Sequence, residues 1–223
     1  MERREGRMRI KPSLALFVLT SISIAALAQS PGDDDQARRR SVELQIEEWK
    51  RQVARNPQDY KVLAAIATAY GSLGRYSESI ELYKEAIAIR PAFPEAHLGL
   101  AITYGFLGKQ AEKITECKTA IRLRPKYGEA HASLGMSYGR VGRYPEAIRE
   151  LKTALELDLT VAQQADAHFA LGLAYAFSGQ FPAALTEQDA LGRLDPRRAA
   201  DLKQMIARVL AVAVGAENRP SRQ

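Results

Sequence analysis

The chain of 223 residues is long enough for one or two domains with a buried core. Hydrophobic residues make up 46% and charged residues 26%, a balance typical of folded rather than disordered proteins. The single cysteine, Cys117, excludes an intramolecular disulfide and any metal site built from several cysteines. The formal net charge is +6, but residues 1–28 carry five basic and two acidic side chains, so the remainder carries only +3. This modest charge argues against a nucleic-acid partner.

Residues 1–28 have the pattern of an export signal. Five basic residues lie within the first 11, an apolar run covers residues 14–28, and small residues end that run. This order is typical of a secretory signal peptide cleaved between Ala28 and Gln29. The alternative is an uncleaved membrane anchor, but the run has 15 residues, three of them hydroxyl residues, whereas roughly 20 apolar residues span a bilayer. We therefore predict export to the periplasm or the cell exterior, with no stable membrane span after cleavage.

Two segments separate this signal from the body of the chain. Residues 29–36 are polar and are predicted to form a linker. Residues 37–55 carry apolar side chains at helical spacing, including Leu44, Trp49 and Val53. We expect this second segment to form a helix.

The sequence from residue 56 to residue 196 repeats itself. Tyr70, Tyr104, Tyr138 and Tyr175 each stand four residues before a glycine, at spacings of 34, 34 and 37. Apolar residues at helical spacing surround each tyrosine, and a glycine at this place ends a helix before a second amphipathic stretch begins. The pattern predicts four helix pairs, at about 60–93, 94–127, 128–161 and 165–198. The three additional residues before the fourth pair are expected to lengthen the turn there.

This pattern resembles tetratricopeptide repeats (TPRs), whose period is 34 residues. The positions where the family has a small residue between the two helices hold Ser79, Lys113, Ala147 and Ala184. Lys113 departs from the family pattern. The resemblance implies an all-α fold, a right-handed α-solenoid of about four helix pairs. Residues 37–55 would then be a half repeat, residues 197–214 a capping helix, and residues 215–223 a disordered tail.

The sequence contains no motif typical of catalysis or of metal or cofactor binding. His97, His131 and His168 occupy equivalent positions, one in each of three pairs. Neighbouring repeats lie about 10 Å apart, too far for one metal ion to bind all three rings at bond lengths of ~2 Å. We interpret these rings as packing between helices, and Cys117 as a small buried side chain. We therefore predict no catalytic residues, no metal, no cofactor and no enzymatic activity.

The resemblance implies that the first helices of the pairs line a groove for a partner. The predicted groove residues are Leu98, Ile102, Phe106, Met136, Arg140, Phe169, Leu173 and Phe177. The apolar ones could take the apolar face of a peptide. TPRs that hold the C-terminal carboxylate of a partner use Lys, Asn and Arg at fixed groove positions, and Ala64, Thr68, Leu98 and Ile102 stand there instead. The predicted function is a scaffold for protein–protein interaction that binds an unidentified protein or peptide segment.

The C-terminal helix leaves two interpretations open, because residues 209–214 are apolar on every side. Val212 and Val214 either fold back on the last helix pair, where the helix could fill the apolar half of the groove, or contact a partner, a second copy or a membrane surface. The second interpretation gives an alternative function. The protein would be an accessory or regulatory subunit of an envelope or secretion enzyme complex, and would form a homodimer through this helix.

Overall fold

The computed structural model describes residues 31–217. The predicted signal peptide, with its cleavage position between Ala28 and Gln29, and residues 218–223 lie outside the described residues. The chain divides into two compact units, residues 1–38 and residues 39–223. The first unit contributes only the beginning of helix α1 to the described residues, and the description below concerns the second unit.

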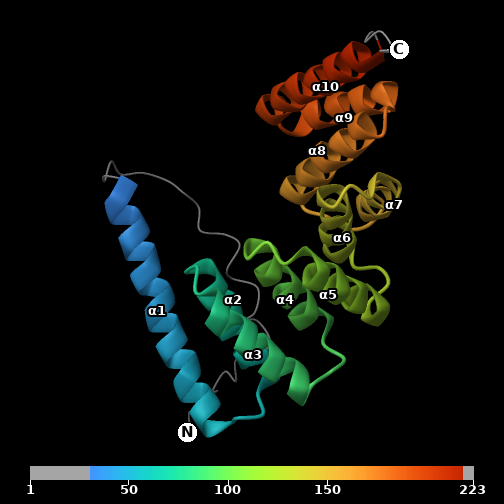
Figure 1. The fold of residues 1–223 in the computed structure, drawn as a ribbon. Helices are drawn as coiled ribbons and strands as arrows, with labels where there is room; N and C mark the ends of the chain where they lie inside the picture. Colours follow the sequence, from blue (N-terminus) through green and yellow to red (C-terminus); the bar gives the residue numbers. More distant parts are fainter. Residues whose placement is uncertain (1–30, 218–223) are drawn as a thin grey trace, which may run out of the picture. The chain divides into compact units, whose positions relative to one another are not determined.

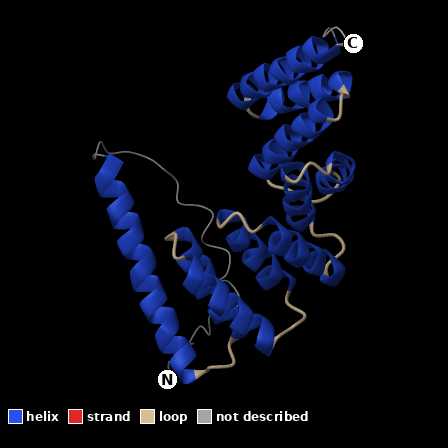
Figure 2. Cartoon of the chain, viewed as in Figure 1, coloured by secondary structure: helices blue, strands red, loops and turns tan. Residues whose placement is uncertain are grey.

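All regular secondary structure in the described residues is helical (Figure 2). The helices are α1 (Pro31–Arg55), α2 (Tyr60–Ser72), α3 (Tyr76–Ile89), α4 (Pro94–Phe106), α5 (Gln110–Leu123), α6 (Gly128–Arg140), α7 (Tyr144–Leu155), α8 (Val161–Phe177), α9 (Phe181–Leu194) and α10 (Pro196–Glu217). Within these residues, no helix has the length and apolar character needed to cross a membrane.

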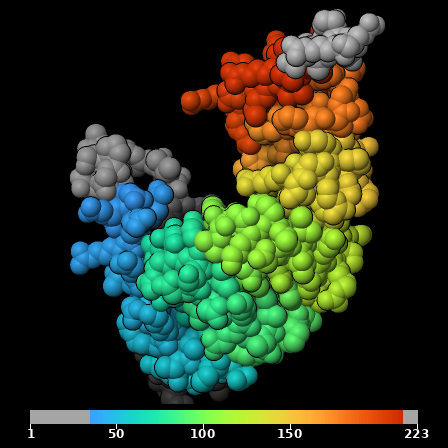
Figure 3. Space-filling model, in the orientation of Figure 1, coloured from blue at the N-terminus to red at the C-terminus, as the bar shows by residue number. Residues whose placement is uncertain are grey.

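Four helical hairpins stack in the order of the chain (Figure 1). They are α2–α3, α4–α5, α6–α7 and α8–α9, and the first helix of each later hairpin packs against the second helix of the hairpin before it. Helix α10 packs against both α9 and α8, as the first helix of a fifth hairpin would. The surface view shows these segments as neighbours in chain order (Figure 3). The arrangement is an α-solenoid, as predicted.

The turn inside every hairpin has the same geometry. Gly74, Gly108, Gly142 and Gly179 all have positive φ, between 72° and 79°, which glycine adopts without steric cost. In the first hairpin, the amide of Arg75 donates to the carbonyl of Tyr70 at 2.9 Å, and that of Gly74 to the carbonyl of Gly71 at 3.0 Å. This is a Schellman cap, and the same two bonds recur in the other three hairpins. The four repeated tyrosines therefore occupy matching places, as the period predicts.

Small residues allow the helices of a hairpin to approach one another closely. Ala86, Ala120 and Ala154 are fully buried at equivalent positions of α3, α5 and α7. Gly135 of α6 faces α7 so closely that a Cβ atom there would lie 2.6 Å from Cγ of Leu151. The core is thus built from tight helix contacts that larger side chains would separate.

The part of α1 in the second unit packs against the first hairpin. Ile46 is buried together with Ile66 and Tyr70 of α2, and Trp49 and Val53 pack against the same cluster. Helix α1 begins at Pro31, so it includes residues 31–36, which the sequence assigned to a linker. That residues 37–55 form half of a repeat stays a prediction.

The turn before the fourth hairpin is one residue longer than the two earlier ones, as expected, since it covers residues 156–160 and they cover 90–93 and 124–127. The greater part of the added length lies in the helix that follows. Helix α8 begins at Val161 and has 17 residues, whereas α6 has 13. The hydroxyl of Thr160 accepts from the amide of Gln163, and the Gln163 side chain accepts from the amide of Thr160. This capping box satisfies the free amides at the start of the extended helix and fixes its beginning.

Candidate partner-binding groove

The predicted groove residues lie on α4, α6 and α8, the first helices of the last three hairpins. Phe106 is 66% exposed, Phe177 50% and Ile102 36%. Arg140 is also exposed, while Met136 and Leu173 are half-buried against the core. Phe169 is half-buried as well, so seven of the eight predicted residues, all except Leu98, present some surface to solvent.

Two of the eight residues, Leu98 and Phe169, pack against the next helix of the stack. Leu98 is only 2% exposed and lies in a core cluster with Leu134 of α6. Phe169 is half-buried against a cluster that contains Leu202 and Ile206 of α10. The following first helix packs on this position in each hairpin. Leu98 in particular offers almost no area to a partner.

Two of the exposed phenylalanines are held in place by aromatic stacking. The Phe106 ring lies 5.3 Å from the ring of Tyr76, and the Phe177 ring lies 5.6 Å from the ring of Tyr144, both nearly parallel. Each stack joins the last residue of a first helix to the first residue of α3 or α7 in the preceding hairpin. Stacking restricts the rings, so each is a preorganised apolar contact that loses little conformational entropy on binding.

Helix α10 does not lie along this row of residues. Its Arg198 pairs with Asp166 of α8 at 2.7 Å, and the Arg198 guanidinium lies 5.2 Å from the centre of the Phe169 ring. Val212 and Val214 are 74% and 48% exposed. The interpretation that these two valines fold back on the last hairpin was therefore wrong. Helix α10 packs against α9 and α8, but it has 22 residues where α9 has 14.

The three histidines are not brought together; each pairs with a glutamate of its own hairpin. Nδ1 lies 2.6 to 2.8 Å from the carboxylate in the pairs His97–Glu116, His131–Glu150 and His168–Glu187. Nε2 of His131 also lies 3.0 Å from the carbonyl oxygen of Pro125. These rings fasten the first helix of a hairpin to the second, which agrees with the packing interpretation. The sequence contained a signal for the partners, because a glutamate follows each histidine by 19 residues.

Two other buried groups have shifted pKa values. Burial raises the pKa of the Cys117 thiol, which is fully buried and therefore stays neutral and unreactive. Burial also raises the pKa of Glu129, at the start of α6. Within the described residues, no group of three or more His, Cys, Asp or Glu side chains could hold a metal ion.

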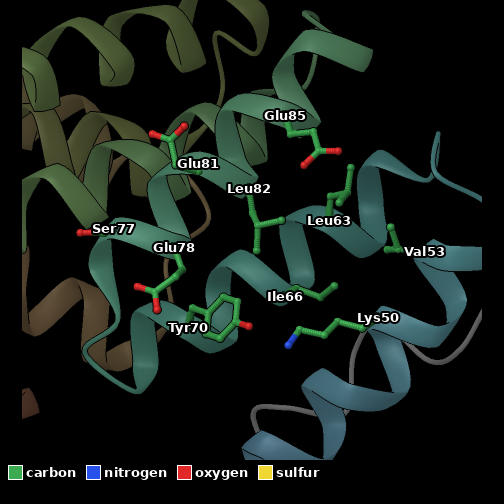
Figure 4. A pocket seen from close by; sticks show the side chains of 10 residues that line it. All are labelled: Lys50, Val53, Leu63, Ile66, Tyr70, Ser77, Glu78, Glu81, Leu82 and Glu85. Atoms are coloured by element: carbon green, nitrogen blue, oxygen red, sulfur yellow. The ribbon is translucent and has the colours of Figure 1, made fainter.

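A cleft that the sequence did not reveal lies between α1, α2 and α3 (Figure 4). Its volume is about 510 Å³, and it is lined by Lys50, Val53, Leu63, Ile66, Tyr70, Ser77, Glu78, Glu81, Leu82 and Glu85. The apolar side chains of α1 and α2 form one wall, and the three glutamates all come from α3. The residues come from three helices, so no single amphipathic pattern could indicate the cleft.

The fold and the repeated turn define a class, the solenoids built from helical hairpins. Within this class, two parts of the chain match family models of tetratricopeptide repeats. A family model described as "TPR repeat" matches residues 67–108, and one described as "Tetratricopeptide repeat" matches residues 132–199. No curated protein matches the chain.

Solved structures of TPR proteins resemble the chain in fold. A TPR protein from Parabacteroides merdae ATCC 43184 is 20% identical, with a TM-score of 0.64 over 85% of this chain and 78% of its own. A thermophilic TPR protein of Thermus thermophilus is 25% identical, with a TM-score of 0.58 over 81% and 95%. YrrB, described as a TPR protein with an unusual peptide-binding site, is 17% identical, with a TM-score of 0.61 over 77% and 88%. At these identities the likeness concerns the fold.

Proposed function

We propose that this protein is a non-catalytic scaffold that binds a segment of a partner protein across the first helices of its hairpins. The observation that carries the proposal is the pair of exposed aromatic stacks at Phe106 and Phe177, at equivalent positions two hairpins apart. Large apolar side chains exposed in a row are typical of interaction surfaces. The fold is that of interaction scaffolds, and YrrB shows that a similar solenoid can carry a peptide-binding site.

The partner would lie over the groove residues that reach solvent and do not pack against the next helix of the stack, which are Ile102, Phe106, Met136, Arg140, Leu173 and Phe177. Aromatic residues in such positions often supply much of the binding energy, and the half-buried neighbours exclude water around them. Leu98 and Phe169 would support this surface from behind by packing against α6 and α10.

The test is capture of partners from the native host by the full-length protein, followed by mass spectrometry. The double variant Phe106→Asp, Phe177→Asp should weaken capture of the specific partner at least tenfold, since hot-spot residues contribute about 2 kcal/mol or more each. Leu185→Asp is the matched control, because Leu185 is 44% exposed on the second helix α9. Equal capture by the double variant and by the control, with helicity unchanged, would refute the groove.

The proposed compartment is the periplasm or the cell exterior. This part of the proposal rests on the charged, apolar and small-residue order of residues 1–28, with cleavage between Ala28 and Gln29. The N-terminal residue of protein recovered from host cells tests it. Gln29 at the N-terminus supports export, whereas an intact Met1 contradicts cleavage.

A second function is favoured by the exposed apolar end of α10. Leu210, Val212 and Val214 are 41%, 74% and 48% exposed on one terminal segment. This segment could join two copies, and the protein would then act as a dimeric accessory or regulatory subunit of an envelope or secretion enzyme complex. Light scattering coupled to gel filtration decides: a dimer that Val212→Asp converts to a monomer supports this alternative, and a monomeric wild-type protein excludes it.

A further inference from the structure

Lys113 stands at a position that is otherwise small and buried. Its equivalents in the first, third and fourth hairpins are Ser79, Ala147 and Ala184, each 0% exposed where the two helices meet. Lys113 is half-buried in α5 at the same place. A long cationic side chain has therefore replaced a small one inside the stack.

The side chain of Lys113 extends along α4 toward the groove. An ideal Cβ atom at Gly105 would lie 3.0 Å from Cδ and 3.3 Å from Nζ of Lys113, so the lysine side chain passes close to the backbone of α4 at this glycine. Gly105 is itself partly exposed and directly precedes the exposed Phe106. The lysine stem thus passes from the second helix α5 across the first helix α4, and its amine ends beside the groove residues.

The positive charge of Lys113 is not compensated. Burial, and to a lesser degree the nearby charge of Arg140, lower the pKa of the Lys113 amine. Neither residue forms an ion pair with a carboxylate in the described part of the chain, whereas Lys50 and Lys84 each pair with a glutamate one turn away. Two cations that repel one another and have no acid paired to either favour an anionic ligand, because the ligand offsets their repulsion.

A second unsatisfied group lies in the same region. Oε1 of Gln110, at the start of α5, is buried and has no hydrogen-bond partner among the described residues. Gln110 is the equivalent of Tyr76 and Tyr144. Arg140 is the equivalent of Phe106 and Phe177, the partners of those tyrosines in the two aromatic stacks. The middle of the row therefore has polar groups in place of an aromatic stack. The Gln110 oxygen is an acceptor that needs a donor, so the preference for an anion rests on Lys113 and Arg140.

We propose that Lys113 and Arg140 form a subsite for the carboxylate of an aspartate or glutamate side chain in the partner segment, with Phe106 packing against a neighbouring apolar residue of that segment. This inference rests on the proposed function and gives the chemistry of its ligand. The guanidinium can bind both carboxylate oxygens and the ammonium adds a further charge-assisted hydrogen bond.

The position of the subsite selects a side chain rather than the end of a chain. Lys113 belongs to the second hairpin and Arg140 to the third (Figure 1). The exposed Phe177 lies beyond them in the fourth hairpin. A segment that covers both aromatic stacks continues past the subsite. Its C-terminal carboxylate therefore lies elsewhere, and the carboxylate that reaches Lys113 and Arg140 must belong to a side chain.

The experiment uses lysine-selective NMR on the full-length protein with isotopically labelled Cε, in which loss of one signal in Lys113→Met assigns Lys113. The probe is the capped dipeptide N-acetyl-phenylalanyl-glutamate amide at millimolar concentration. It should move the Lys113 signal saturably and return the pKa of Lys113 toward that of an ordinary lysine. The isosteric glutamine dipeptide should leave the signal unchanged. Arg140→Gln should weaken binding of the glutamate probe about tenfold or more.

Three results would overturn the assignment. They are a Lys113 signal that no probe moves, an equal response to inorganic phosphate, and a stronger response to N-acetyl-phenylalanine, whose carboxylate is terminal. The exposed Lys152 of the outer helix α7 provides the control signal, which should not respond. The measurement requires no partner protein, so its failure removes the carboxylate subsite alone, while partner capture with the Phe106 and Phe177 variants tests the groove separately.

Discussion

Replacing Gly135 with alanine tests the close contact between α6 and α7. A Cβ atom at this position of α6 would lie 2.6 Å from Cγ and 3.1 Å from the backbone nitrogen of Leu151, and 3.2 Å from the carbonyl oxygen of Ala147. Two of these three atoms belong to the backbone of α7. Leu151 is 0% exposed and cannot swing into solvent. The added methyl group must therefore push α6 and α7 apart.

The expected magnitude follows from two opposing terms. Overpacking of this kind costs about 1–3 kcal/mol, and alanine in a helix interior gains about 0.8–1.0 kcal/mol over glycine. The net effect of Gly135→Ala is a loss of up to about 2 kcal/mol. Gly139→Ala is the control, because it lies one turn along the same helix and its Cβ would meet only Cβ of Ala147, at 3.9 Å. The control should gain about 0.5–1 kcal/mol.

Urea unfolding followed by far-ultraviolet circular dichroism measures both free energies of unfolding. Repeat arrays can unfold in parts, so native-state hydrogen exchange of the α6 and α7 amides should report the same order locally. If Gly135→Ala is as stable as Gly139→Ala, α6 and α7 do not approach one another as closely as described.

Three further substitutions probe the fold. Burial raises the pKa of Glu129 above its ordinary 4.5, so the folded state binds this proton more tightly than the unfolded state does. Stability therefore falls as the pH rises from 4.5 through the raised pKa. Glu129→Gln should raise the melting temperature at pH values above the raised pKa and leave it unchanged below pH 4.5. His131→Phe should lower the free energy of unfolding by about 1–3 kcal/mol, because it leaves the Glu150 carboxylate and the Pro125 carbonyl oxygen without this partner. A double-mutant cycle with Glu150→Gln, measured by urea unfolding, would show no coupling energy if the 2.8 Å contact between His131 and Glu150 were unimportant. Gly108→Ala should cost about 1 kcal/mol through φ of +72° alone, since nothing lies within 4 Å of its Cβ position; unchanged urea unfolding would contradict the positive φ.

The hairpins could be predicted because their signals are local. Helical periodicity around Tyr70 and its three equivalents, and a glycine four residues later, determine where each first helix lies and where it ends. The structure has Schellman caps at all four of these glycines. The histidines could likewise be assigned to packing, because one position repeated in successive hairpins cannot converge on a single point.

The contribution of a residue to the groove could not be read from the sequence, because it depends on the neighbouring hairpin. Leu98 and Ile102 belong to the same predicted surface, yet Leu98 is 2% exposed and Ile102 36%. Helix α6 packs over one and leaves the other open. The side chains of residues 212–214 were similarly ambiguous, because only the direction of α10 relative to the last hairpin decides whether that apolar end is covered.

The sequence by itself determined the helices, their period and the capped turns between them, because backbone propensity and amphipathic spacing act within a few residues along the chain. The tertiary structure alone decided which groups meet across helices. It pairs His131 with Glu150, and it carries the amine of Lys113 past Gly105 toward Arg140. Such contacts depend on the distance and rotation between packed helices, and those are set by the volume of every side chain in the interface rather than by the local pattern of either helix.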